Sequence, residues 1–367
     1  MYRTPLWGLA LSMGLGFASG CSQTSDDELT QALANMQQHF DYFNGCKPNG
    51  NKPNGNKPNG CKPNGNKPNG TIINMRADQG AQGQSKLVGY HVEAGTNITG
   101  AAFVGARITA RFTTNEEEQA DIVGHDNTTV PGKDLYLALS AVDGQPMCGY
   151  DSSNNPIWAT VMNDLFDADT GAQVASDPNY FTLACRFGAI EKCNEYGYTK
   201  WIAGIEQNGG ASKVRNFNDY HAACVRMVRA DYCGDGAPHT YDGTSIDIYD
   251  HLQDGNAMAT STTGADGYYF EAYWRDDGAH CIKHTRWMPS SLTTMAENLS
   301  TANPIYNYVR VNCPDRLYNP PAGVTRSITN CDNPNFNTSV GYSMYPSGTS
   351  TQPGRLLTAN NSKMNRY

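Results

Sequence analysis

A small group of histidines and aspartates in the second half of the chain is best suited to acid–base chemistry. An imidazole and a carboxylate within hydrogen-bond reach can exchange a proton with a substrate. The candidate catalytic residues are His221, Asp235, His239 and Asp242. No Gly-x-Ser-x-Gly motif accompanies them, so the sequence does not predict a serine nucleophile. Catalysis would require these side chains to meet in an open cleft, whereas singly buried histidines would favour a non-enzymatic protein.

Short cysteine–histidine spacings raise the question of a zinc site. His221 lies three residues before Cys224, and Cys281 lies three residues before His284. Zinc sites use such spacings, but disulfides consume thiolates in an oxidising compartment. The aspartates of residues 235–250 suit calcium, yet their spacing differs from the twelve-residue calcium loop, and Asp-Gly is a common hairpin turn. We therefore predict no metal site and no cofactor.

The N-terminal segment predicts export. Arg3 precedes an apolar stretch at residues 6–17, and small residues lead from there to Cys21. The run Ala-Ser-Gly-Cys resembles a bacterial lipobox, in which Cys21 would be lipidated and become the mature N-terminus; plain signal-peptidase cleavage is the alternative. Lipidation would leave an even number of the eleven cysteines, which suits a disulfide-bonded exported chain. The remaining disulfide candidates are Cys46, Cys61, Cys148, Cys185, Cys193, Cys224, Cys233, Cys281, Cys313 and Cys331.

Spacing alone does not fix how these cysteines pair. We expect Cys224 in the middle of a helix and Cys233 just beyond the end of that helix. A direct bond needs the two Cα atoms within about 7 Å, which nine residues of mostly helix could exceed. The alternative is crossed bonding to one of three other cysteines: Cys185, Cys193 or Cys281.

Composition and charge exclude one class of partner. The 367 residues carry a net charge of -8 with a pI of about 5.5, and the basic residues do not gather on a periodic face. Nucleic-acid binding normally begins with a positive patch, so we predict no nucleic-acid partner. The twenty-one tyrosines and five tryptophans suit a β core, or the binding of carbohydrate or peptide.

Residues 46–70 repeat a five-residue unit of the form x-Lys-Pro-Asn-Gly. Every unit carries a turn signal, and proline is its one apolar residue. Such a segment cannot offset its ordering entropy with a core, so we predict a flexible stalk. The alternative is a folded β-helix. An amphipathic helix over residues 26–43 is expected to precede the repeat.

A second five-residue period follows in the Gly-rich segment. Ile98, Phe103 and Ile108 recur at this spacing between small residues. The pattern resembles the pentapeptide repeats of a right-handed β-helix, with one apolar side chain turned inward per unit. A hairpin or edge strand of the main domain explains the same residues equally well.

The remainder of the chain predicts a mainly β fold with a few helices (α+β) that is loop-rich and tied by disulfides. Alternating patterns indicate strands, and a 3.6-residue period with Asn218 or Asp219 as cap indicates a helix. The expected strands are 134–142, 180–185, 245–250 and 268–274, and the expected helices are 219–230 and 290–300, with Leu292, Met295 and Leu299 inward. From Asn303 onward we expect loops held by a disulfide.

One long run resembles a known family. Residues 221–250, "HAACVRMVRADYCGDGAPHTYDGTSIDIYD", are similar to the signature of the ADYC domain, which takes its name from residues 230–233. The flanks agree, and the resemblance covers about residues 135–287. It implies a bacterial secreted or surface lipoprotein without an assigned activity. The expected organisation is a signal peptide (1–20), an anchor and helix (21–45), a stalk (46–70), a Gly-rich β segment (71–133), the ADYC domain (134–300) and a loop-rich extension (301–367).

These observations favour a cell-surface or secreted lipoprotein that acts as a non-enzymatic binding or structural module on a flexible stalk. Its expected partners are the membrane, through a lipid anchor at Cys21, and an extracellular or envelope ligand. The alternative is an exported hydrolase with a histidine–aspartate site, with or without a metal, around His221, His239 and Asp242.

Overall fold

The computed structural model describes residues 60–326 and 358–366 with short gaps. The gaps are residues 68–69, 81–83, 112–116, 164, 167–172, 176–180, 209–210, 242–243, 245, 251–267 and 364. The predicted signal peptide, Cys21, the expected helix at 26–43 and the first part of the repeat lie outside these residues. Among the described residues no helix is both long enough and apolar enough to span a membrane.

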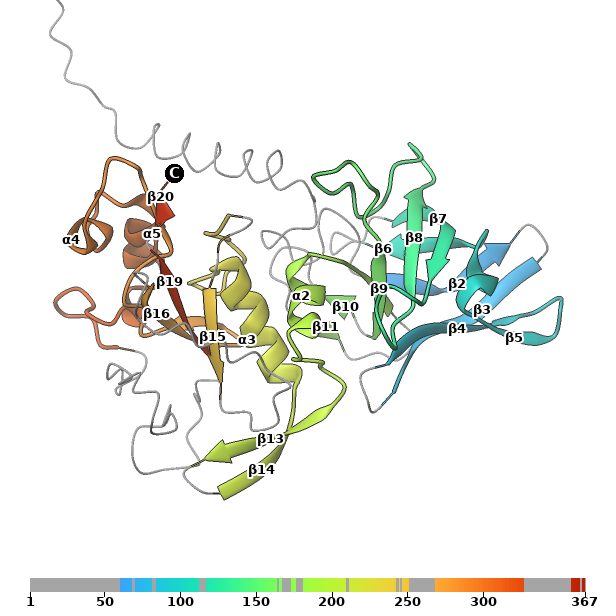
Figure 1. Cartoon of the computed structure of the whole chain (residues 1–367), viewed down its shortest axis with the longest axis horizontal. Coiled ribbons are helices and arrows are strands. Elements are labelled where there is room, and N and C mark those ends of the chain that lie inside the picture. Colours follow the sequence, from blue (N-terminus) through green and yellow to red (C-terminus); the bar gives the residue numbers. More distant parts are fainter. Residues whose placement is uncertain are drawn as a thin grey trace, which may run out of the picture. The chain divides into compact units, whose positions relative to one another are not determined.

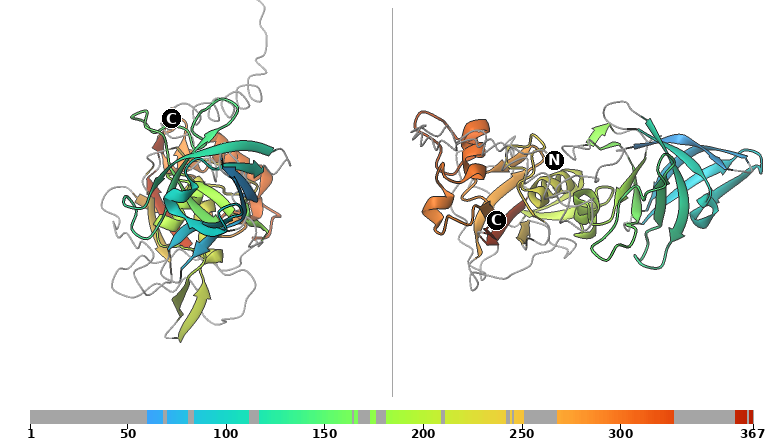
Figure 2. Two further views of the ribbon diagram at one scale, coloured as in Figure 1. Left: turned by 90° about the vertical axis from the view of Figure 1, so that its right-hand side faces the viewer. Right: turned by 90° about the horizontal axis from the view of Figure 1, so that it is seen from above.

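The larger sheet has nine antiparallel strands in the order β12-β9-β8-β7-β6-β2-β3-β4-β5 (Figure 1). In chain order they are β2 (Gly60–Lys67), β3 (Gly70–Gln79), β4 (Ser85–His91), β5 (Thr96–Thr99), β6 (Arg107–Arg111), β7 (Glu117–Asp126), β8 (Leu135–Ser140), β9 (Ala159–Asn163) and β12 (Phe181–Cys185). Strand β12 also pairs with β2, with Phe181 opposite Cys61. This pairing closes β2, β6, β7, β8, β9 and β12 into a ring, and the strands wrap round a common centre in Figure 2.

The inside of this sheet holds the principal hydrophobic core. Because strand residues alternate between two faces, alternate side chains of β3, β7, β8, β9 and β12 belong to this core. The large apolar members are Met75, Leu87, Ile98, Phe103, Ile108, Ile122, Tyr136, Met147, Ile157, Val161, Phe181 and Leu183. On β8, Tyr136 and Ala138 join this core while Leu137 and Leu139 are half-buried on the opposite face.

The Gly-rich segment follows the hairpin alternative and not the β-helix. Ile98 lies on β5, Phe103 in the 3-10 turn η1 (Gly100–Phe103) and Ile108 on β6, all of them buried. Their five-residue spacing arises because a strand, a short turn and the next strand each place one side chain in the same core. Every strand pairing in this part of the sheet is antiparallel.

The end of the repeat corrects the flexible-stalk prediction for residues 60–67, which form β2. Strand β2 pairs with β3 and with β6, and these backbone hydrogen bonds stabilise a segment whose only apolar residues are Cys61 and Pro63. Its pairing with β6 shifts register between Cys61 and Gly65, the interval that contains Pro63. A proline has no N–H group for the ladder, so an irregularity is where a strand tolerates one.

A second sheet, in the order β15-β19-β16-β17, lies in the C-terminal half. Helix α3 (Asn218–Arg229) packs against β16 and β17. The strands are β15 (Ile246–Asp250), β16 (Tyr268–Arg275), β17 (Gly278–His280) and β19 (Thr358–Lys363). Two-stranded pairs are β10 (Leu165–Phe166) with β11 (Gln173–Ala175), β13 (Ala203–Asn208) with β14 (Ala211–Asn216), and β18 (Trp287–Met288) with β20 (Asn365–Arg366). The remaining helices are α2 (Ala189–Glu195), α4 (Met295–Asn298), α5 (Pro304–Asn312) and the 3-10 turn η2 (Pro314–Arg316).

The helix predictions have mixed outcomes. Helix α3 lies where its period predicts, but its N-cap is Phe217, with no side-chain capping hydrogen bond, in place of the expected Asn218 or Asp219. The helix ends at Ala230, which adopts the left-handed conformation with φ 52°. Helix α4 is one turn only, and its buried residue is Asn298 in place of the three apolar residues expected inward. Helix α5 replaces the loops predicted after Asn303, whose side chain accepts a hydrogen bond from the Ile305 N–H and thereby caps the helix.

Three disulfides that lie wholly within the described residues follow one another along the chain without overlap. They join Cys148 to Cys185, Cys193 to Cys224, and Cys233 to Cys313. Cys224 therefore uses one of the crossed partners considered above, whereas the partner of Cys233 lies 80 residues away and outside the expected set. Cys281 is also disulfide-bonded.

Candidate functional site

The Ala-Asp-Tyr-Cys run that ends α3 forms a buried polar network. The carboxylate of Asp231 is fully buried and accepts a hydrogen bond from Arg226 Nη1 at 2.5 Å. It lies 3.6 Å from Arg229 Nη1 and also accepts the backbone N–H of Gly236. A buried carboxylate is stable only when it is paired in this way. Asp231 therefore ties the helix to the loop that follows it.

The next residue, Tyr232, connects the helix end to the second sheet. Its hydroxyl donates to Glu271 Oε1 on β16 at 3.0 Å and accepts the backbone N–H of Arg286 at 2.8 Å. Burial, reinforced by the nearby Glu271 carboxylate, raises the pKa of Tyr232 well above its ordinary value. The hydroxyl therefore stays protonated and serves as a structural donor.

Arg286 completes this network. Two of its guanidinium nitrogens contact the two carboxylate oxygens of Glu271, each at 3.0 Å. The same guanidinium donates to the carbonyls of Met227 and Val228. These carbonyls lie in the last turn of α3, where a helix leaves acceptors unsatisfied and favours positive charge. Arg286 thus neutralises a buried carboxylate and caps the helix at once.

Cys233 and the adjacent Gly234 stabilise the turn that follows α3. Cys233 is bonded to Cys313 beyond α5. Gly234 has φ +72°, and an added Cβ would lie 1.8 Å from the backbone oxygen of Asp277. Only glycine fits at such a distance. The residues of the run hold α3, β16 and α5 in place.

The structure does not place the candidate catalytic histidines in a cleft. His221 is 2% exposed, and its Nε2 lies 2.9 Å from the carbonyl oxygen of Ile190. Burial lowers the pKa of His221 to about 3, with a further contribution from Lys200. His221 also contacts the Phe166 ring. An imidazole this buried and this weakly basic is poorly suited to general base catalysis near neutral pH.

His239 lies in different surroundings. It is 3% exposed, and its ring lies 4.7 Å from the ring of Tyr308 and 5.9 Å from that of Tyr232, measured between centroids. Within the part of the chain that the structure describes, neither ring nitrogen has a hydrogen-bond partner. Burial lowers the pKa of His239 to about 4. His239 is therefore a neutral imidazole packed among aromatic rings.

The other candidates do not complete a catalytic group. Asp235 is exposed and accepts hydrogen bonds from the Tyr308 hydroxyl at 2.5 Å and from the Ala237 N–H, as an acidic side chain does in a turn. Asp242 lies outside the described residues. The thiols of Cys224, Cys233 and Cys281 are in disulfides, so they cannot serve as thiolate ligands. Among the described residues no three or more metal-ligating side chains are grouped to hold an ion.

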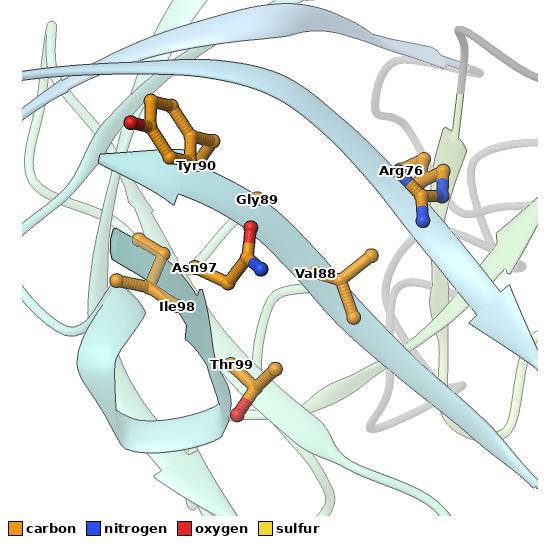
Figure 3. Close-up of a pocket in the computed structure, with 7 residues that line it drawn as sticks. All are labelled: Arg76, Val88, Gly89, Tyr90, Asn97, Ile98 and Thr99. Carbon is orange, nitrogen blue, oxygen red and sulfur yellow. The ribbon is translucent and has the colours of Figure 1, made fainter. Parts of the chain in front are cut away.

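A surface hollow lies elsewhere, on the outer face of β3, β4 and β5 (Figure 3). Its volume is about 500 Å³, which falls in the range of small-molecule sites. Its lining residues are Arg76, Val88, Gly89, Tyr90, Asn97, Ile98 and Thr99. We call this site the β3–β5 groove.

Strand alternation places the polar side chains of the β3–β5 groove on one face. Val88 lies opposite both Arg76 and Thr99, and Tyr90 lies opposite Asn97. Opposed residues have Cβ atoms about 5 Å apart, so these five side chains form one continuous patch. No sequence motif marks this site, although the alternation in Ser85–His91 indicates which of its residues share a face.

Comparison with known proteins identifies the family and nothing closer. No curated protein and no solved structure matches the chain. The model of the ADYC domain matches residues 95–288, which include β5 of the groove, the helix α3 and the buried network at its end. That match spans more than half of the sequence, and the chain belongs to the ADYC domain family.

Proposed function

We propose that this chain is a non-enzymatic binding module of an exported protein and that the β3–β5 groove is its ligand site. One contrast carries the proposal. The histidines that could have served catalysis are buried singly, whereas the groove presents exposed polar and aromatic side chains in a concave site. Ligand sites generally combine a hollow with a few convergent polar groups.

The state of the histidines supports binding over hydrolysis. A general base near neutral pH needs a pKa close to the working pH and access to the substrate. His221 and His239 have pKa values lowered to about 3 and about 4, and both are nearly inaccessible. Such burial is typical of structural side chains in the interior of a folded domain.

The proposed location of the protein is the bacterial cell surface. Disulfides persist in oxidising compartments, and three are present among the described residues. The lipobox-like run before Cys21 supports a lipid anchor in the membrane. We propose that the anchored chain binds an extracellular or envelope ligand.

Filling the groove tests the proposal. Thr99→Trp adds a large side chain at an exposed lining residue whose own side chain makes no capping hydrogen bond. The matched control is Val142→Trp, at a residue that is 85% exposed and outside the groove. The full-length protein and both variants are applied to arrays of glycans and peptides. Retention that Thr99→Trp abolishes and Val142→Trp preserves supports the groove, and equal retention by both variants overturns it.

A parallel assay tests the hydrolase alternative. The full-length protein is incubated with ester, glycoside and peptide substrates, together with a His239→Gln variant. We expect no turnover above that of a blank. Turnover that His239→Gln abolishes would establish the exported hydrolase and contradict the non-enzymatic proposal.

A further inference from the structure

We propose that the β3–β5 groove binds an acidic saccharide, a hydroxyl-rich sugar chain that carries carboxylate groups. This inference rests on the proposed function, because it names the ligand class of the same groove. It is built from the chemistry of four side chains and from the local shape of the sheet.

Arg76 is the cationic side chain of the groove. It is exposed at one side of the groove, and the described residues provide no ion-pair partner for it. Arg107 of the same sheet is also exposed, but its guanidinium is paired with Asp121 at 2.7 Å. An unpaired guanidinium in a concave site favours a ligand that supplies the missing anion. Its planar fork matches a carboxylate with two parallel hydrogen bonds.

A β-bulge lies beside Arg76. The register of β3 against β4 shifts between Ile73 and Arg76, where three residue steps on β3 face two on β4. A bulge bends its strand and re-aims the next side chain, and bulges are frequent beside functional sites. Arg76 therefore follows directly after the bulge, at the side of the groove that β3 forms.

Tyr90 supplies the second recognition element. Tyr90 is 37% exposed on β4, where it alternates with the buried residues Gly89 and His91. Figure 3 shows Tyr90 and Arg76 at opposite sides of the groove, with Val88 and Asn97 between them. An aromatic ring that is apolar on its face and polar at its hydroxyl suits a sugar ring, which has the same division between C–H and O–H groups.

Asn97 and Thr99 complete the polar lining from β5. The amide of Asn97 offers two donors and an acceptor, and the hydroxyl of Thr99 offers both functions. This mixture matches the hydroxyls of a sugar, each of which also donates and accepts. With strands about 4.8 Å apart, the side chains cover roughly 10 Å across the three strands, which suits a short saccharide segment.

The position of these groups argues against a peptide added to the sheet. Such a peptide would bind the free backbone edge of β5, since strand addition uses main-chain hydrogen bonds. The groove instead presents side chains from the face of three strands. The whole chain carries a net charge of -8, so attraction of an anion has to come from a local cation.

The test uses a glycan array that carries uronic-acid oligosaccharides beside neutral oligosaccharides of the same length. We expect the full-length protein to bind the uronic-acid members, and we expect about 0.5 M salt to weaken this binding. Arg76→Ala should reduce the affinity at least about tenfold, and Arg76→Lys should restore part of it. Tyr90→Ala should weaken binding similarly, whereas Tyr90→Phe should keep most of the affinity. Arg107→Ala removes the same charge outside the groove and should leave the affinity unchanged.

The outcomes separate this inference from the proposed function. The protein could bind neutral glycans or peptides but no uronic-acid glycans, and Thr99→Trp could abolish that binding. This result would overturn the assignment of an acidic saccharide as ligand, and it would leave the groove as a ligand site. Wild-type affinity of Arg76→Ala for uronic-acid glycans would also overturn it. Absence of any binding that Thr99→Trp abolishes would overturn both.

Discussion

Replacing His239 with phenylalanine should stabilise the protein, and more so in acid. The imidazole is 3% exposed, and neither of its nitrogens has a partner among the described residues. A buried donor without a partner costs about 1–3 kcal/mol. Phenylalanine suits this site, because the rings of Tyr232 and Tyr308 already line it. We therefore expect the free energy of unfolding to rise by about 1 kcal/mol at pH 8.

The acid dependence follows from the pKa of the same group. Burial lowers the pKa of His239 from 6.5 to about 4 in the folded protein. Between these values the unfolded chain binds more protons, so stability falls as the pH falls from about 6.5 toward 4. At pH 5 the wild-type protein has lost about 2 kcal/mol of stability through this group, and His239→Phe abolishes that loss. The advantage of the variant should then reach about 3 kcal/mol at that pH.

Urea unfolding of wild type and variant at several pH values from 8 to about 5 measures this difference. His221, whose pKa burial lowers to about 3, contributes a similar slope in both proteins. His280, whose pKa is also lowered by burial, contributes as well, so the slope of stability against pH should fall but not vanish. Tyr308→Phe is the control, because it alters the neighbouring ring but keeps the imidazole. An unchanged slope in His239→Phe would refute the buried, neutral histidine.

Other predictions test the turn, the buried ion pair and the anchor. Gly234→Ala should destabilise the protein by more than about 3 kcal/mol, because the new methyl group collides with a backbone carbonyl. Gly323→Ala, also at positive φ but in open space, should lose about 1–2 kcal/mol, and similar thermal midpoints for the two would contradict this close approach. Glu271→Gln should lower the free energy of unfolding by about 3 kcal/mol, since it leaves Arg286 buried without its countercharge; a wild-type urea midpoint would count against the pair. The intact mass of the membrane fraction should show an acylated Cys21, and an unmodified mature N-terminus in the soluble fraction would exclude the anchor.

The sequence predicted those elements whose stability is encoded locally. Helix α3 follows from its apolar period and from the polar residues at its start, and strands β12, β15 and β16 follow from alternation. Strand β2 does not, because its partners β3, β6 and β12 supply hydrogen bonds that no local pattern records. Helix α5 had a usable signal, since Asn303 followed by Pro304 is a typical helix start.

The candidate site was less predictable than the fold. The spacing of His221, Asp235 and His239 is compatible with catalysis, but spacing does not reveal burial, and burial removes two of the three from reach of a substrate. The Ala-Asp-Tyr-Cys run was visible as a family signature, yet its role depends on Glu271 and Arg286, which are distant in sequence and meet it only in the folded chain. The β3–β5 groove depends on which sheet face meets solvent, and alternation leaves that choice open.

The succession of disulfides determines how the chain would respond to a pulling force. Fully extended, the residues from Cys148 to Cys313 would reach about 560 Å. The bridges replace sequence separations of 37, 31 and 80 residues by Cα–Cα distances of 5.5, 5.8 and 5.6 Å. Between Cys148 and Cys313, only the short linkers from Cys185 to Cys193 and from Cys224 to Cys233 can then extend, to about 60 Å together. A module held at one end and loaded at the other would transmit tension through these covalent bonds, and most of the residues between Cys148 and Cys313 would bear no load.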